Sequence, residues 1–397
     1  MTPLLLSAYT ATSCLGTGLE ATLAALRAQR CGLTPCDFDT VDLPTYIGAV
    51  AELASQRVPA FLSDHDCRNN RLAALALQQD EFRAALDAAV ARYGADRIAL
   101  FLGTSTSGIY ETELAYRRRD PASGALPADL HYAGAHNSFS LADFTRRLLG
   151  LTGPAAVVCT ACSSSAKVFA SAQRALAAGL VDAALVGGVD SLCLTTLYGF
   201  HSLQLTSPQP CRPFDVARDG ISIGEAAAFA LLTRAPPAPD PDAVLLLGTG
   251  ESSDAHHMSS PHPEGLGART AMQQALARAA LAAEDIDYIN LHGTGTVSND
   301  AAESRAVNAL FPVRTAVSST KGATGHTLGA AGALEAVICA LALRHQFLPG
   351  GVNTAQVDAV LQMDYLRTSR PARVRRVLSN SFGFGGANCA LVFGRAG

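Results

Sequence analysis

The chain has 397 residues, of which 49% are hydrophobic and 16% are charged, so it can bury a large core and form two or more structural units. A net charge of −4 and the lack of a basic stripe argue against a nucleic-acid-binding protein. No run of about 18 apolar residues occurs, so no membrane span is expected.

Cysteine usage and the N-terminus indicate the compartment. The ten cysteines are scattered without the spacing of a small disulfide scaffold, which is typical of reduced thiols in a cytoplasmic protein. No Cys-x-x-Cys pair is matched by a second one, so we expect no metal, and nothing in the chain calls for a cofactor. Residues 1–9 are apolar without a basic flank, which predicts a first strand rather than a signal peptide.

The first part of the chain alternates strands and helices. Residues 97–105 predict an apolar strand that runs into a Gly-Thr turn, and the polar residues 119–128 predict a surface insertion. Residues 153–159 predict a buried strand, and the Ala-rich residues 163–178 predict a helix. We expect the Val-Gly-Gly-Val stretch at 186–189 to begin another turn.

Cys162 lies where the apolar run ends and the small-residue helix begins. The free N–H groups and the dipole of a helix N-terminus favour a thiolate and can bind an oxyanion. We therefore expect Cys162 to be a nucleophile with a lowered pKa, and Cys159 to be an ordinary buried residue.

A linker divides the chain into unequal parts. Residues 234–242 contain four prolines and predict an exposed connector, so we place the units at 1–239 and 240–397.

The second part repeats the pattern of the first. Residues 286–294 correspond to the strand at 97–105, residues 315–321 predict the next strand, 329–344 a helix, and 350–352 the Gly-Gly turn. This similarity indicates a duplication. Strands that alternate with helices indicate largely parallel sheets, whose ligands bind at the carboxyl ends of the strands.

Cys162, His292 and His326 lie in three such strand-end loops. If the halves pack with pseudo-twofold symmetry, the three residues converge at one site. A cysteine could then act as nucleophile, while two neutral imidazoles stabilise an enolate or orient a carboxylate that leaves as carbon dioxide. One cysteine and two histidines therefore favour carbon–carbon chemistry.

Four motifs carry a family resemblance: 160–164 (Thr-Ala-Cys-Ser-Ser), 291–296 (Leu-His-Gly-Thr-Gly-Thr), 319–326 (Ser-Thr-Lys-Gly-Ala-Thr-Gly-His) and 380–388 (Asn-Ser-Phe-Gly-Phe-Gly-Gly-Ala-Asn). They resemble, in order, those of the elongating Cys-His-His type of β-ketoacyl-[acyl-carrier-protein] synthases. The resemblance implies the α/β thiolase fold, with two duplicated βαβαβαββ-like halves in five αβαβα layers.

The resemblance also implies roles at the reacting centre. Cys162 would accept the acyl chain as a thioester, with its own N–H and that of Phe384 as oxyanion donors. Phe384 resembles a gate between loading and condensation. His292 and His326 would promote decarboxylation of a malonyl unit and stabilise the enolate.

Further residues match supporting positions of the family. Lys321, the only lysine besides Lys167, resembles a structural and electrostatic residue that Glu303 and Glu335 accompany. Asp254 resembles the anchor of a second mobile loop. The remaining matches are Phe382 and Gly385 beside the gate and Ile109 in the acyl pocket at the dimer interface.

The resemblance also implies two protein partners. An acidic acyl carrier protein would dock on Arg68, Arg71 and Arg212, and a second thiolase-fold subunit would complete a homodimer or heterodimer. Residues 220–228 depart from the usual fatty-acid pattern, so a polyene or polyketide-like pathway stands beside fatty-acid elongation.

Three alternatives remain open at this stage. A coenzyme A-dependent thiolase would have a second active-site cysteine where this chain has Phe384, and an initiating synthase would have asparagine in place of His326. A non-catalytic chain-length factor would lack the nucleophile Cys162.

Overall fold

The computed structural model describes residues 2–397. In chain order, the helices and strands of the first half are β1 (Leu4–Ser13), β2 (Gly16–Thr17), α1 (Gly18–Arg27), β3 (Thr34–Pro35), β4 (Tyr46–Gly48), α2 (Arg68–Leu77), α3 (Phe82–Tyr93), β5 (Ile98–Gly103), α4 (Ile109–Arg117), α5 (Ser140–Leu149), β6 (Ala155–Val158), α6 (Ser164–Ala177), β7 (Ala183–Asp190), α7 (Leu194–Ser202), β8 (Ile223–Gly224) and β9 (Ala226–Arg234).

The second half continues with β10 (Val244–Ser253), α8 (Leu266–Ala279), β11 (Tyr288–Asn290), α9 (Val297–Asn308), β12 (Ala316–Ser318), α10 (Lys321–Thr324), α11 (Ala331–His345), β13 (Phe347–Leu348), β14 (Asp364–Tyr365), β15 (Arg370–Pro371), β16 (Arg376–Gly383) and β17 (Ala387–Arg395). Strands alternate with helices over much of both halves, but no α-helix separates β13, β14, β15, β16 and β17.

Strand order reveals the duplication. The first half has the order β6-β5-β7-β9-β1, and the second has the order β12-β11-β16-β17-β10 with the short strand β14 added beyond β12. Apart from β14, the two orders are the same when each set is numbered along the chain. In both, the first three strands are parallel and the last two pairings are antiparallel. The halves join where β1 pairs with β10. The expected duplication is confirmed, because chance would not reproduce the order twice.

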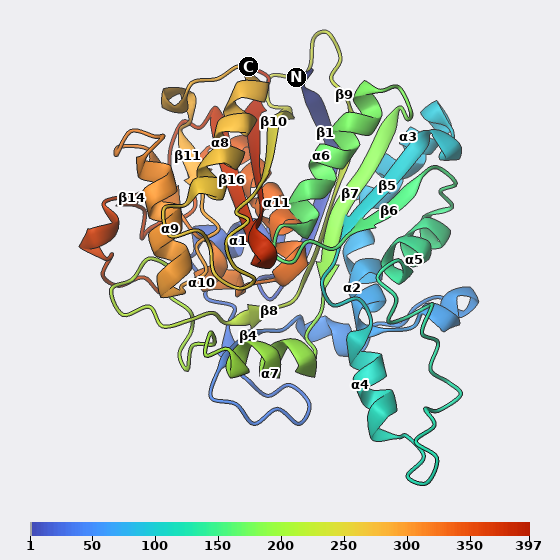
Figure 1. The fold of residues 1–397 in the computed structure, drawn as a ribbon. Coiled ribbons are helices and arrows are strands. Elements are labelled where there is room, and N and C mark those ends of the chain that lie inside the picture. Colours follow the sequence, from blue (N-terminus) through green and yellow to red (C-terminus); the bar gives the residue numbers. More distant parts are fainter. Residues whose placement is uncertain (1) are drawn as a thin grey trace.

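The sheets and helices form five layers (Figure 1). Helices α2 and α5 cover one face of the first half-sheet, and α6 packs on its other face against β5 and β7. Helix α11 packs against α6, β9 and β16, and α8 covers β10 and β17 from outside. The helix starts of α6 and α11 therefore lie in the middle of the molecule, where both halves contribute loops.

Helix α11 with the short turn before it, Leu328–His345, is long and apolar enough to cross a membrane, with a mean hydropathy of 1.4. Within the described chain 89% of this segment is buried. It packs against helices and strands of both halves, which makes it the central core helix.

The Gly-Gly turn expected at 186–189 is wrong, because these residues lie inside the buried strand β7. The glycines serve close packing. A Cβ on Gly188 would lie 2.4 Å from the Cβ of Ser165 at the start of α6. The glycines at 350–351 lie instead in a loop after β13, so the two pairs do not correspond.

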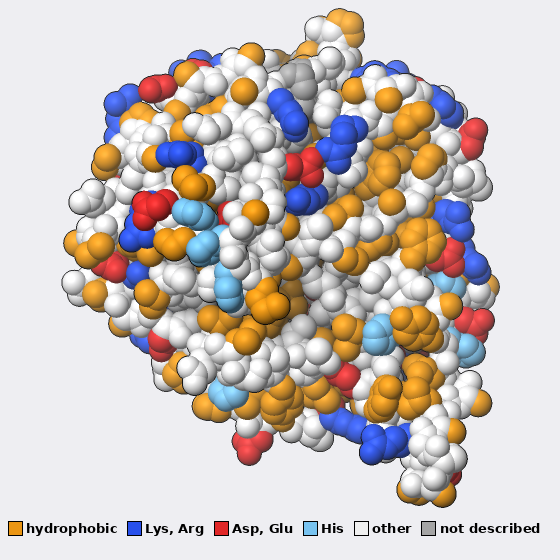
Figure 2. Space-filling model, in the orientation of Figure 1, with side chains coloured by type: hydrophobic (Ala, Val, Ile, Leu, Met, Phe, Trp, Pro, Cys, Tyr) orange, Lys and Arg blue, Asp and Glu red, His pale blue; other side chains and the backbone are white. Residues whose placement is uncertain are grey.

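The strand expected at 153–159 exists as β6, but it is not buried. It pairs only with β5, each of its residues is half-exposed, and Cys159 is exposed, contrary to expectation. Figure 2 shows hydrophobic side chains gathered on the side of the molecule that carries β6 and α5. The apolar sequence of this edge strand is typical of a covered strand, but within the described chain the strand stays half-exposed.

Candidate active site

The turn before α6 presents Cys162. Ala161 adopts φ +51°, in the left-handed region, and Ser164 Oγ accepts from Thr160 N–H at 2.9 Å. Alanine is strained in this conformation, so the surrounding contacts must hold it there. Cys162 thereby lies two residues before α6 and is 5% exposed, as expected for a residue at a helix start.

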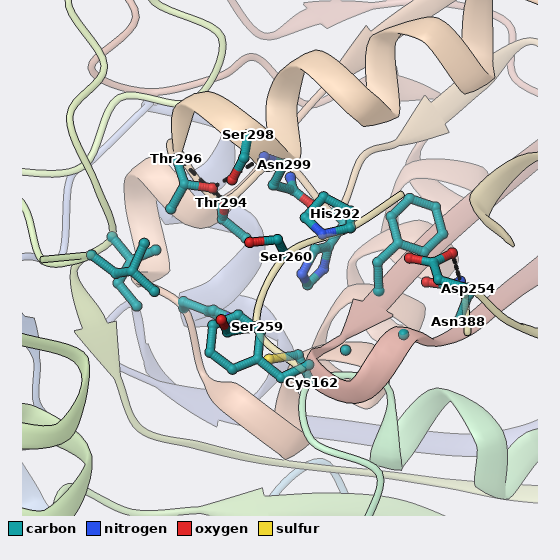
Figure 3. Close-up of a pocket in the computed structure, with 18 of the residues that line it drawn as sticks. Cys162, Asp254, Ser259, Ser260, His292, Thr294, Thr296, Ser298, Asn299 and Asn388 are labelled. Atoms are coloured by element: carbon teal, nitrogen blue, oxygen red, sulfur yellow. Dashed lines mark hydrogen bonds between the residues drawn. The ribbon is translucent and has the colours of Figure 1, made fainter. Parts of the chain in front are cut away.

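The structure brings Cys162, His292 and His326 together. His292 follows β11, and His326 lies between α10 and the 3-10 turn Leu328–Ala330. The sulfur atom and one nitrogen of each ring lie within 4.8 Å of one another, and the two rings meet edge to face at 5.3 Å. Figure 3 shows Cys162 and His292 lining the same cavity.

Burial sets the protonation of all three groups. It raises the pKa of the Cys162 thiol to about 11, although Lys321 and the N–H of Phe384 act in the opposite direction. The expectation of a lowered thiol pKa is therefore wrong for this state, because desolvation outweighs the helix terminus and the ammonium. Burial, and then Lys321, hold the pKa of His292 and His326 well below 6.5, so both rings are neutral.

Lys321 is buried behind the histidines. Its Nζ forms an ion pair with Glu335 and donates to the carbonyl of His292 at 2.5 Å, and it lies 3.4 Å from Nδ1 of His292. Burial raises the pKa of Glu335 to about 7, against the effect of Lys321. The ammonium thus fixes the His292 loop and makes protonation of either ring costly.

Glu303 holds the same loop from the other side. Its carboxylate accepts from the N–H groups of His292 at 2.8 Å and Gly293 at 2.7 Å and from Nδ2 of Asn380 at 3.1 Å. Burial raises its pKa to about 7. We expected Glu303 beside Lys321, but its contacts are with the loop. Asn380 lies in the motif at 380–388, but its hydrogen bond to Glu303 could not be predicted from its residue type.

The loop Gly383–Gly386, where we expected a gate, lies against the turn of Cys162. Phe384 is half-buried with its ring 5.6 Å from that of Phe200 in α7, and Gly385 and Gly386 both have φ +77°. The Phe384 N–H approaches the Cys162 sulfur, and the Phe382 ring packs 5.7 Å from His292.

Asp254 ties this loop to a second one. Its N–H donates to the carbonyl of Gly386 at 2.9 Å, and its carboxylate accepts from Nδ2 of Asn388 and from the N–H of His262. The N–H of Gly385 also donates to the carbonyl of Met258 at 2.8 Å. These bonds link the two loops. Asn388 ends the motif at 380–388, but its contact with Asp254 and that of Met258 with Gly385 were not predicted, since hydrogen bonding across loops leaves no local pattern.

The cavity at Cys162 is small. Its volume is about 60 Å³. Apolar side chains line part of it, Phe200, Leu205 and Ile221 among them. Hydroxyl and amide groups line another part, among them Ser259, Ser260, Thr294, Thr296, Ser298 and Asn299 (Figure 3).

Four other expected residues do not line this cavity. Ile109 begins α4 and does not line it. Arg68 is clamped by Glu225 at 2.6 Å and its side chain is 18% exposed. Arg71 and Arg212 form ion pairs with Asp66 and Asp219 and have side chains 29% and 27% exposed. All three arginines, which we expected to dock a carrier, thus form ion pairs within the chain.

One thiol and two imidazoles are also a donor set for Zn²⁺. However, Lys321 Nζ lies 3.4 Å from Nδ1 of His292, and this positive charge opposes a dication at the same place. The arrangement suits acyl transfer better: a sulfur nucleophile, backbone N–H donors, and two neutral rings facing one small cavity.

Comparisons with known proteins agree with this geometry. The 3-oxoacyl-[acyl-carrier-protein] synthase of Arabidopsis thaliana mitochondria is 39% identical over 262 residues, 62% of this chain and 57% of the relative. The 3-oxoacyl-[acyl-carrier-protein] synthase 2 of Rhizobium meliloti is 40% identical over 260 residues, 62% of each chain. The match thus spans about 60% of the length of these curated relatives.

Solved structures match along the whole chain. A chain of the ketosynthase in complex with its chain length factor from Xenorhabdus doucetiae has a TM-score of 0.90 and 41% identity, covering 100% of this chain and 98% of that one. The ishigamide ketosynthase/chain length factor has a TM-score of 0.89 and 29% identity over all of both chains.

Family models match both halves in order. Residues 5–238 match the N-terminal domain of beta-ketoacyl synthase and residues 243–355 its C-terminal domain. Together with the thiolase fold and the Cys-His-His site, these matches establish that the chain belongs to the beta-ketoacyl synthase family.

Proposed function

We propose that the protein is a β-ketoacyl-[acyl-carrier-protein] synthase, an acyltransferase that condenses an acyl group on Cys162 with malonyl-[acyl-carrier protein]. The observation that carries this proposal is the meeting of the Cys162 sulfur with one nitrogen each of His292 and His326 within 4.8 Å. The half 1–239 would supply the nucleophile, and the half 240–397 the histidines and the gate.

In the first step Cys162 attacks the thioester carbonyl of the acyl carrier. Its proton passes to the departing carrier thiol, the carrier C–S bond breaks, and an acyl thioester forms on Cys162. The N–H groups of Cys162 and Phe384 would hold the oxyanion, since the latter already approaches the sulfur. The raised thiol pKa means that deprotonation accompanies the attack, with neutral histidines available to relay the proton.

In the second step the malonyl unit loses its carboxylate. The C–C bond to the carboxylate breaks, carbon dioxide leaves, and the electron pair remains as an enolate whose oxygen accepts hydrogen bonds from His292 and His326. The enolate carbon then forms a C–C bond to the acyl carbonyl, the Cys162 C–S bond breaks, and the Cys162 thiolate takes a proton from solvent. Lys321 and Glu303 hold the His292 loop throughout.

Carrier docking is proposed beside the cavity. The backbone of Arg212 lies against Gly295, between the lining residues Thr294 and Thr296. Arg212 would therefore meet an acidic carrier near the cavity. Arg71, which is 29% exposed, is a weaker docking residue, and Arg68 serves the fold through Glu225. Arg212→Glu should raise the apparent KM for carrier-bound substrate and leave kcat unchanged.

A thiolase-fold partner would cover the half-exposed β6 edge. The full-length likeness to a ketosynthase that is solved with its chain length factor supports a heterodimer and a polyene or polyketide-like pathway over fatty-acid elongation. Ile109 would then line the acyl pocket at this interface. Native mass spectrometry of the protein alone and with a co-expressed partner distinguishes a homodimer from a heterodimer.

The test of the function uses Cys162→Ala with acyl and malonyl carriers. Wild-type protein should gain the acyl mass on Cys162 and release a β-ketoacyl carrier with carbon dioxide, and the variant should do neither. Full condensing activity of Cys162→Ala would refute the proposal. Acyl carriers of graded length and unsaturation, followed by mass spectrometry of the acyl enzyme, identify the preferred chain.

A further inference from the structure

Helix α10, the single turn Lys321–Thr324, connects two residues of the site. Its first residue is Lys321, and His326 follows it by two residues. A helix of four residues cannot satisfy all its own carbonyl groups, so they need partners from elsewhere. The position of the ammonium and of the second imidazole therefore depends on what binds these carbonyls.

Three thiols from separate parts of the chain point at consecutive carbonyls of α10. Cys211 Sγ lies 3.2 Å from the carbonyl oxygen of Lys321, and Cys31 Sγ lies 3.5 Å from that of Gly322. Cys14 Sγ lies 3.5 Å from the carbonyl oxygen of Thr324, and 3.6 Å from that of the residue before it.

These contacts have the character of hydrogen bonds rather than of simple packing. Burial raises the pKa of Cys14 to about 12 and that of Cys211 to about 11, so both sulfurs carry the proton that a donor needs. Asn353 joins two of the groups, because its Nδ2 lies 2.8 Å from the carbonyl of Gly322 and 3.5 Å from Cys31 Sγ. The partners thus form one connected set around the turn.

The far end of the segment is fixed by backbone bonds. The N–H of His326 donates to the carbonyl of Ser222 at 2.7 Å, and its carbonyl accepts from Gly224 at 3.0 Å. Backbone N–H groups also bind α10, since Gly325 donates to the carbonyl of Lys321 at 2.8 Å and Gly32 to that of Ala323 at 2.9 Å. The thiols complete the set of contacts that directs the Lys321 side chain. From there Lys321 reaches Glu335 and the His292 carbonyl.

We propose that Cys14, Cys31 and Cys211 are positioning residues, whose thiols hold α10 so that Lys321 and His326 are aligned for decarboxylation of the malonyl unit. The proposal rests on the proposed condensing function. Acyl transfer to Cys162 needs the α6 turn and the gate loop, whereas decarboxylation needs the histidines and Lys321. Loss of the thiols should therefore slow the second step selectively.

The experiment compares the triple variant Cys14→Ala, Cys31→Ala and Cys211→Ala with the same three positions changed to Ser. Weak donors of this kind contribute modestly, so we expect about a fivefold loss of carbon dioxide release and condensation in the Ala variant. Acyl loading of Cys162, followed by mass spectrometry, should stay within about twofold of wild type. Serine restores the donors and should recover most of the lost rate.

The matched control is Cys389→Ala, which removes a fully buried thiol from β17, away from α10. It should reduce neither step. Equal losses of loading and condensation, an unchanged Ala variant, or a Ser variant as slow as the Ala variant would each overturn the proposal. If the triple variant does not fold, Cys211→Ala and Cys211→Ser carry the same comparison. A wild-type protein that neither loads nor condenses would instead refute the proposed function.

Discussion

Substitutions in the buried pair of Lys321 and Glu335 allow effects on stability to be measured separately from effects on catalysis. Both side chains are almost fully buried, at 1% and 3% exposure, and their charged atoms are in contact. Removing one partner of such a pair leaves an uncompensated buried charge. We therefore expect Lys321→Met to lower the free energy of unfolding by about 3–5 kcal/mol.

The pH dependence of that loss follows from Glu335. Even beside the ammonium, burial raises its pKa from 4.5 to about 7. Without Lys321 the folded-state pKa rises further, so the folded protein is favoured while Glu335 is protonated and loses that stability as pH rises through this pKa. The deficit of Lys321→Met should therefore be larger at pH 8 than at pH 5.5, as measured by denaturant unfolding with the variant and wild type in parallel.

The double variant Lys321→Met with Glu335→Leu is the decisive control. It removes both charges from an apolar environment, and stability should return to within about 1–2 kcal/mol of wild type. Decarboxylation should remain slow, because the ammonium that lies 3.4 Å from His292 Nδ1 is gone. A double variant as unstable as the single one, or one that condenses at the wild-type rate, would refute this reasoning.

Three further predictions follow from burial and packing. Glu111→Gln should stabilise the protein at pH 8 by up to about 3 kcal/mol but not at pH 5, since burial raises the Glu111 pKa from 4.5 to about 7 and ionisation then destabilises the folded state; equal effects at both pH values would contradict this. Gly188→Ala should cost about 1–3 kcal/mol in denaturant unfolding, because its Cβ would lie 2.4 Å from that of Ser165; an unchanged midpoint would show that α6 can shift. Alkylation of Cys162 by iodoacetamide should accelerate about tenfold per pH unit from pH 6 to 9, since its pKa is about 11; a plateau near pH 7 would indicate a thiolate–imidazolium pair instead.

Much of the fold could be predicted from the sequence because its signals are local. Apolar runs mark β5, β6 and β11, and the Ala-rich stretches mark α6 and α11. The glycines of β7 were misread as a turn. Gly188 is required because Ser165 approaches it closely. This contact joins segments that are distant in the sequence, so composition does not reveal it. In the same way β6 has a core-like sequence although the single chain leaves it at an edge.

The residues of the site also fall into those that a local pattern reveals and those whose contacts depend on tertiary structure. Cys162, His292 and His326 were recognisable because each stands in a family motif, although α10 separates His326 from the end of β12. The orientation of Arg68 toward Glu225, and of Glu303 toward the His292 loop, depends on tertiary contacts. Arg68 and Glu303 therefore bind partners inside the fold, since a guanidinium or carboxylate near a buried partner is stabilised by pairing.

The protonation states of Cys162, His292 and His326 affect how one cavity can serve both acyl loading and decarboxylation. A thiolate–imidazolium pair would favour acyl loading but would leave a cation where the enolate step needs neutral donors. Burial, and then the charge of Lys321 beside His292, hold the pKa of His292 well below 6.5 and so disfavour that pair. Under the proposed function, the thiol would stay protonated until a thioester carbonyl reaches the N–H groups of Cys162 and Phe384. The burial that keeps the histidines neutral for decarboxylation would thus also raise the pKa of Cys162, which must lose its proton during attack.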